Sequence, residues 1–175
     1  MGVASASDGV REAVAGAICN IAVLEEGGRV MAMEGVRDAL VGMGVASASD
    51  GVREAVAGAI HNIALSDAGR RVMARVEVRD VLVGMGRAAA SDEARGVIAR
   101  AVGAVAESEA GRRMMATEAV CAMLHGMFWG LDAPVARDEV ASARARGVTP
   151  GGAETTTVRY PSGQTRLSGL ARSCF

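Results

Sequence analysis

The amino-acid sequence predicts an all-α fold, an α-solenoid of about three helical repeats. Two observations carry this prediction. The stretch from Met1 to Ile18 recurs without a change as Met43 to Ile60, and a diverged third copy begins at Met85, so that successive copies start 42 residues apart. A fixed period of about 40 to 47 residues with helical content is typical of stacked helical repeats. The second observation is that apolar residues within each copy recur at helical spacing.

Each copy predicts one long helix of about 16 residues. In the second copy the helix follows Ser49, because Ser or Asp directly before an apolar-periodic run is a typical N-cap, and Ser7 and Ser91 hold the same place in the other copies. One side of each helix then carries an apolar stripe, which we expect to be buried. The three stripes are Val10, Val14, Ala17, Ile18 and Ile21; Val52, Val56, Ala59, Ile60 and Ile63; and Ala94, Ile98, Ala101, Val102 and Val105.

Two shorter helices complete each repeat. The long helix is followed by GGRVM, GRRVM or GRRMM, and we expect the first glycine of this segment (Gly27, Gly69 or Gly111) to end the long helix at its C-terminus. The third segment reads VRDALVGM, VRDVLVGM or VCAMLHGM, with apolar residues at helical spacing. Each repeat therefore predicts a long, a short and a middle helix.

These segments resemble the armadillo repeat family over most of the chain. GRRVMARVEVRDVLVGM, from Gly69 to Met85, follows the first part of the family pattern, and Gly35 lies on its inter-helix glycine. AICNIA and AIHNIA follow the last part, with Asn20 and Asn62 on the family asparagine. The resemblance implies a right-handed superhelix whose long helices line a concave, peptide-binding surface.

The chain departs from the armadillo pattern at three kinds of position. The missing proline gives some weight to HEAT repeats, which are the alternative class and also an all-α solenoid. The missing tryptophan argues against a basic nuclear-localisation peptide, because Lys stems pack between indole faces, and Arg100 opposes a basic ligand further. The proline position holds Asp38, Asp80 and Ala122, the tryptophan position holds Gly16, Gly58 and Arg100, and the third asparagine is Ala104.

The repeats are expected to span residues 1–131. Met1 corresponds to Met43 inside a repeat, so the first repeat is expected to be truncated, and its uncapped apolar end could drive self-association. Residues 132–146 predict a weak terminal helix. Residues 147–175 are rich in Gly, Ser, Thr and Pro and predict a disordered tail.

Composition argues against several functional classes. Net charge is −1 and the pI about 6.1, so no overall field favours nucleic acid or an anionic membrane. No signal peptide or membrane-length apolar run is present. Three scattered cysteines fit a reducing compartment, which predicts a cytoplasmic location with the nucleus left open.

The sequence predicts no catalytic site, metal site or cofactor. Cys121 and His125 lie four residues apart on a predicted helix, but structural zinc sites take four ligands and no further Cys or His is nearby. Nucleotide-binding and nucleophile motifs are also absent. We therefore expect a non-enzyme.

The candidate site lies on the predicted long helices, opposite the apolar stripes. Asn20 and Asn62 are predicted to hydrogen-bond the backbone of an extended peptide, since an amide is both donor and acceptor; the alternative is that each ties adjacent repeats together. Glu12, Glu54 and Arg100 are predicted to select a ligand with uneven charge along its length.

Taken together, the residues favour a non-catalytic protein–protein interaction scaffold that binds an extended partner segment on the concave face of its long helices. The near-identical first two copies and the truncated first repeat support an alternative. In this second interpretation the chain is a fragment of a longer repeat protein, with a structural role or no independent function.

Overall fold

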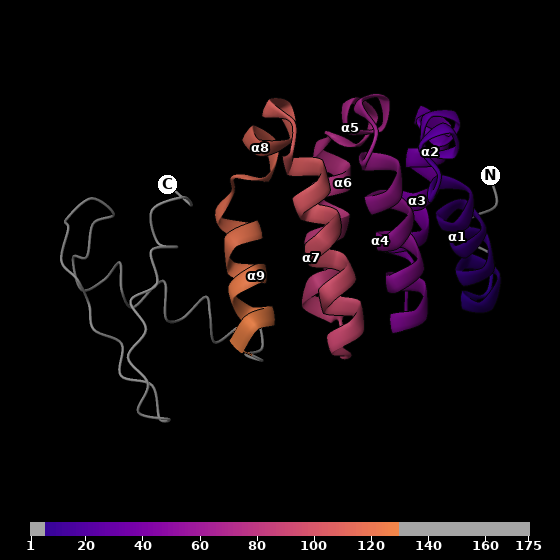
Figure 1. Ribbon diagram of the computed structural model, residues 1–175. Coiled ribbons are helices and arrows are strands. Elements are labelled where there is room, and N and C mark those ends of the chain that lie inside the picture. The colour runs from indigo at the N-terminus through magenta and orange to yellow at the C-terminus, as the bar shows by residue number, and fades with distance from the viewer. Residues whose placement is uncertain (1–5, 130–175) are drawn as a thin grey trace, which may run out of the picture.

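The computed structural model describes residues 6–129, and in this range the chain forms nine α-helices and no strand (Figure 1). The all-α prediction is confirmed there. The expected terminal helix at 132–146 and the expected tail at 147–175 lie outside the described residues. The helices are α1 (Asp8–Ala22), α2 (Glu25–Met31), α3 (Glu34–Val45), α4 (Asp50–Ala64), α5 (Asp67–Met73), α6 (Val76–Ala88), α7 (Asp92–Ala106), α8 (Glu109–Met115) and α9 (Glu118–Trp129).

The helices follow one another as three units, each with a long, a short and a middle helix. The long helices α1, α4 and α7 lie side by side, and α4 packs against both of the others (Figure 1). The middle helices α3, α6 and α9 pack in the same order in a second layer. The short helices α2, α5 and α8 form a row along one edge of the two layers, at the top in Figure 1. Equivalent residues of successive units therefore stand on neighbouring helices.

Serine side chains begin most of the long and short helices. Ser49 and Ser91 accept hydrogen bonds from the backbone N–H groups of Val52 and Ala94, at 3.4 and 3.1 Å. Ser66 does the same for α5, where the Gly69 N–H lies 3.0 Å from its Oγ. These bonds satisfy N–H groups that have no partner inside the helix. Ser7 precedes α1 without a side-chain cap, so its predicted capping bond is not formed.

Glycines in the short helices have a different role from the expected one. Gly27, Gly69 and Gly111 do not end the long helices; they lie inside α2, α5 and α8, which begin two residues earlier. A Cβ atom at Gly69 would overlap the carbonyl oxygen of Ile63, and the other two glycines meet the preceding long helix in the same way. Glycine lets the short helix cross directly over the end of the long one.

The core lies between the two layers and includes the predicted stripes of the second and third copies. All five stripe residues of α4 are fully buried, and those of α7 are buried as well. The prediction fails for the first copy. Val10, Val14 and Ile21 are 53, 46 and 49% exposed, although their sequence context is the same as in α4. The difference is tertiary: no described helix precedes α1 and covers its stripe.

Candidate functional site

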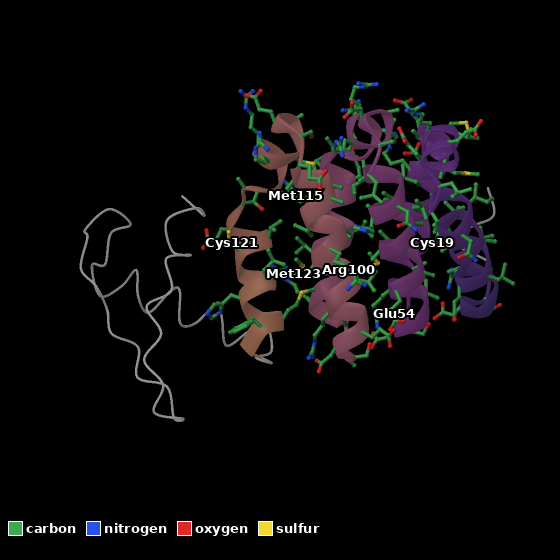
Figure 2. The ribbon with its side chains drawn as sticks, in the orientation of Figure 1. Cys19, Glu54, Arg100, Met115, Cys121 and Met123 are labelled. Carbon is green, nitrogen blue, oxygen red and sulfur yellow. The ribbon has the colours of Figure 1, made fainter. Side chains whose placement is uncertain are left out.

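The five residues predicted to bind a partner lie on the three long helices. Glu12 and Asn20 are on α1, Glu54 and Asn62 on α4, and Arg100 on α7. Figure 2 shows Glu54 and Arg100 on the side of the molecule that the long helices form. We call the exposed side of α1, α4 and α7 the long-helix face.

Asn62 connects two units. Its Nδ2 donates to the backbone carbonyl oxygen of Cys19 at 3.1 Å and lies 3.3 Å from the Cys19 Sγ. The side chain is half-buried between α4 and α1. Asn20, its equivalent in the first copy, is exposed, and its side chain makes no hydrogen bond within residues 6–129. The two asparagines therefore differ, and the inter-repeat contact holds for Asn62. Ligand binding by either one stays a prediction.

The two acidic residues lie against the start of the following long helix. Glu54 Oε1 accepts a hydrogen bond from the Ser91 hydroxyl at 3.2 Å, next to the first turn of α7. The Glu12 carboxylate lies over Gly51 in the first turn of α4, where an added Cβ would stand 2.7 Å from Oε2. A negative charge near a helix N-terminus is favourable. Both carboxylates therefore contribute to the packing of units, and their predicted role in charge selection is untested.

Arg100 is the predicted cation of this face. Its side chain is exposed, lies beside Gly96, and forms no ion pair within the described part of the chain. Its backbone carbonyl oxygen lies 3.3 Å from Nδ1 of His61 on α4. Of the three charged candidates, Glu54 accepts a hydrogen bond and Glu12 lies over Gly51, whereas Arg100 has no acidic partner among residues 6–129.

Gly58 and Cys19 mark a close approach between α1 and α4. A Cβ atom at Gly58 would stand 3.1 Å from the Cys19 Sγ, whereas one at Gly16 would meet nothing within 4 Å. Glycine at 58 thus has a packing reason that glycine at 16 lacks. Burial raises the pKa of the Cys19 thiol, and the hydrogen bond from Asn62 offsets this only in part. The thiol is therefore a poor nucleophile near neutral pH.

Sequence reasoning missed two carboxylates that link successive units. Asp50 Oδ2 accepts backbone N–H bonds from Ala90 at 3.0 Å and Ser91 at 2.7 Å, and Asp8 Oδ2 accepts from Ala48 at 3.1 Å. The sequence does contain a sign of this role, because an aspartate directly follows the serine before each long helix: Asp8, Asp50 and Asp92. In the sequence this pair is explained by helix capping alone.

A recess of about 530 Å³ lies between α3 and α6, and Arg53 of α4 also contributes to its lining. Its lining is mainly apolar and includes Val41, Val81 and Met85, with Glu77 and Asp80 among the lining residues. None of the five predicted residues reaches it. The recess and the long-helix face are therefore separate surfaces.

Within residues 6–129, no group of three His, Cys, Asp or Glu side chains is placed to hold a metal ion. No helix in the same range is long and apolar enough to cross a membrane. Comparison of the chain with protein-family models, curated proteins and solved structures finds no match.

Proposed function

We propose that the chain is an armadillo-like α-solenoid that acts as a non-catalytic scaffold and binds an extended segment of another protein on the long-helix face. The observation that carries this proposal is the side-by-side packing of α1, α4 and α7. It sets equivalent positions of successive copies in rows across neighbouring helices. An extended chain laid across the helices would meet one position of each row in turn.

The asparagine row supplies the backbone contacts of this proposal. Asn62 Nδ2 is held by Cys19, so the side chain is oriented, and its Oδ1 receives no hydrogen bond from the described residues. A fixed amide oxygen can accept one backbone N–H of a ligand with little loss of side-chain entropy. Asn20 is exposed and offers both donor and acceptor.

Arg100 supplies the charge preference. The carboxylates of Glu12 and Glu54 lie against the next unit, whereas the Arg100 guanidinium has no acidic partner among residues 6–129. A planar guanidinium binds a carboxylate through two parallel hydrogen bonds. We therefore expect an acidic residue where the bound segment crosses α7.

Peptide selection tests this function directly. A random peptide library is selected on the immobilised full chain, and the dissociation constants of the selected peptides are measured by fluorescence anisotropy. We expect acidic peptides whose affinity falls at least about tenfold on Arg100→Glu, because an attractive pair becomes a repulsive one. Arg113→Glu is the matched control, since its side chain is 79% exposed on α8, away from the face.

Two outcomes would contradict the proposal. One is a selection that yields no peptide with micromolar or tighter affinity. The other is a set of peptides whose affinity is unchanged by Arg100→Glu and by Asn20→Ala, which would place the binding surface elsewhere, with the recess between α3 and α6 as the next candidate.

A further inference from the structure

The exposed stripe of α1 has a buried counterpart in α4. The helices α1 and α4 have the same sequence except at Cys19 and His61. In α4 the stripe is completely buried, whereas Val14 in α1 is 46% exposed. The same side of one helix is therefore core in one unit and surface in the other.

The covering of the α4 stripe shows what fits it. The helix α4 packs against α1, α2 and α3 of the preceding unit, and α7 packs against α4, α5 and α6. Val56 of the α4 stripe lies next to Gly44 on α3, where an added Cβ would stand 3.5 Å from its side chain. The third set, α7 to α9, is a further copy of the same arrangement, and no described helix covers its far side. The side of α7, α8 and α9 that corresponds to the covering side of α1, α2 and α3 therefore meets no described helix.

Polar groups at the two ends match in the same way. Asn62 donates to the carbonyl of Cys19, and their equivalents at the ends are Asn20 and Gly103. The Asn20 side chain makes no hydrogen bond within residues 6–129, and Gly103 is exposed. Asp50 accepts from the N–H groups of Ala90 and Ser91. Its equivalent Asp92 has a fully exposed side chain, bonded only to Arg95 among the described residues, and the N–H groups that would meet it are those of Ala6 and Ser7.

The middle helices carry an independent sign of the same pairing. Inside the chain, the upstream helix presents glycine and the downstream helix a larger residue: Gly44 meets Val81, and Gly86 meets Met123. At the ends the sizes are exchanged. The upstream equivalent is Phe128, which is 79% exposed, and the downstream equivalent is Ala39. A large side chain would again face a small one, but here the large one (Phe128) is on the upstream helix and the small one (Ala39) is on the downstream helix.

From these relationships we propose that the α1 stripe binds a second copy of this chain, head to tail, through the far side of its α7, α8 and α9. The interface repeats the contact between successive units within the chain. Asn20 of one copy donates to the Gly103 carbonyl of the other, and Phe128 packs on Ala39. Such a contact is heterologous, so it continues into longer assemblies unless the rotation closes a ring.

Sedimentation velocity of the full chain over a range of concentrations is the first test. We expect association that Val14→Glu weakens by at least about tenfold, because the glutamate puts a charge at the centre of the apolar stripe. Ile21→Glu, also on the exposed stripe, is the second variant. Leu65→Glu is the control: Leu65 is 51% exposed at the end of α4, outside the stripe, and should leave association unchanged.

Mixing two blocked variants tests the head-to-tail direction. Val14→Glu blocks the α1 side and Phe128→Glu blocks the α9 side, so each variant alone should be monomeric. An equimolar mixture should form a one-to-one dimer, because each variant retains the side that the other lacks. If Phe128→Glu alone still associates, the contact does not involve α9 and the proposal is wrong.

Exchange of the size pair tests the proposed register. Ala39→Met should weaken association because it meets Phe128, and Phe128→Gly should weaken it because it leaves a gap. The double variant recreates the pairing of Gly86 with Met123 and should regain affinity. If the double variant instead loses as much association free energy as the two single variants together, the proposed register is wrong. A monomer at every concentration overturns the whole proposal.

Discussion

The side-chain amide of Asn62 donates to the backbone carbonyl of Cys19 at 3.1 Å and so joins α4 to α1. Asn20 occupies the same place in an almost identical helix and makes no such bond within the described residues. One residue type in one local sequence therefore has two environments, and the pair separates the effect of packing from the effect of sequence.

Asn62→Ala should destabilise the chain by about 1 kcal/mol, which is the usual net contribution of one hydrogen bond. Asn20→Ala should change stability by less than about 0.5 kcal/mol, because exposed substitutions away from special contacts have small effects. Urea unfolding followed by circular dichroism measures both. Equal losses for the two variants would show that the bond to Cys19 contributes nothing to stability.

Replacing glycine by alanine should change the stability of the chain in opposite directions at Gly69 and Gly84. Gly69→Ala should destabilise the chain by at least about 2 kcal/mol, because its Cβ would overlap the Ile63 carbonyl oxygen and the backbone must move. Gly84→Ala should stabilise it by up to about 1 kcal/mol, because alanine is the better helix former and nothing lies within 4 Å of the added Cβ. Thermal melts of both variants check the prediction, and a stable Gly69→Ala would contradict it.

The positions of the long helices can be predicted from the sequence, but which helices pack against each of them cannot. Period and apolar spacing predict where the long helices begin, because capping and amphipathic burial are local properties. Ser49 and the stripe that includes Val56 are found this way. Val14 has the same local sequence as Val56, and its exposure depends on what packs against α1. Local patterns carry no information on that point.

The candidate site was only partly predictable for a related reason. Helical spacing shows which side of α4 carries Asn62, but it does not show whether that side faces a ligand or the preceding helix. Asp50 and Gly69 show the same limit. A capping aspartate and a helix-ending glycine explain their positions in the sequence. In the structure Asp50 joins two units, and Gly69 lets α5 pack closely on α4 within one unit.

Asp50 should make the chain acid-sensitive. Burial acts to raise its pKa, but the Arg53 side chain and the N–H groups of Ser91 and Ala90 outweigh burial and lower the pKa from its usual 3.8. With the folded-state pKa below the unfolded one, the stabilisation is complete above the unfolded value and is lost as pH falls through the folded value.

The measurement is the urea midpoint at about pH 6 and about pH 3. Asp50→Asn should lower the midpoint at the higher pH and reduce the difference between the two. At low protein concentration Asp92→Asn is the matched control, because it removes the equivalent carboxylate of α7, which contacts no later unit among the described residues. A wild-type pH dependence in Asp50→Asn would assign the acid sensitivity to other groups.

Val56→Ala and Val14→Ala compare one residue in two environments. Val56 is fully buried, so its truncation should cost about 2 kcal/mol through lost burial and a residual cavity. Val14 is 46% exposed, and at low protein concentration its truncation should be nearly neutral, because the gain in helix propensity offsets the small loss of burial. Thermal melts at low and high concentration check both values. If a second copy covers the α1 stripe, the cost of Val14→Ala should rise with concentration while that of Val56→Ala stays constant, because only Val14 gains burial on association.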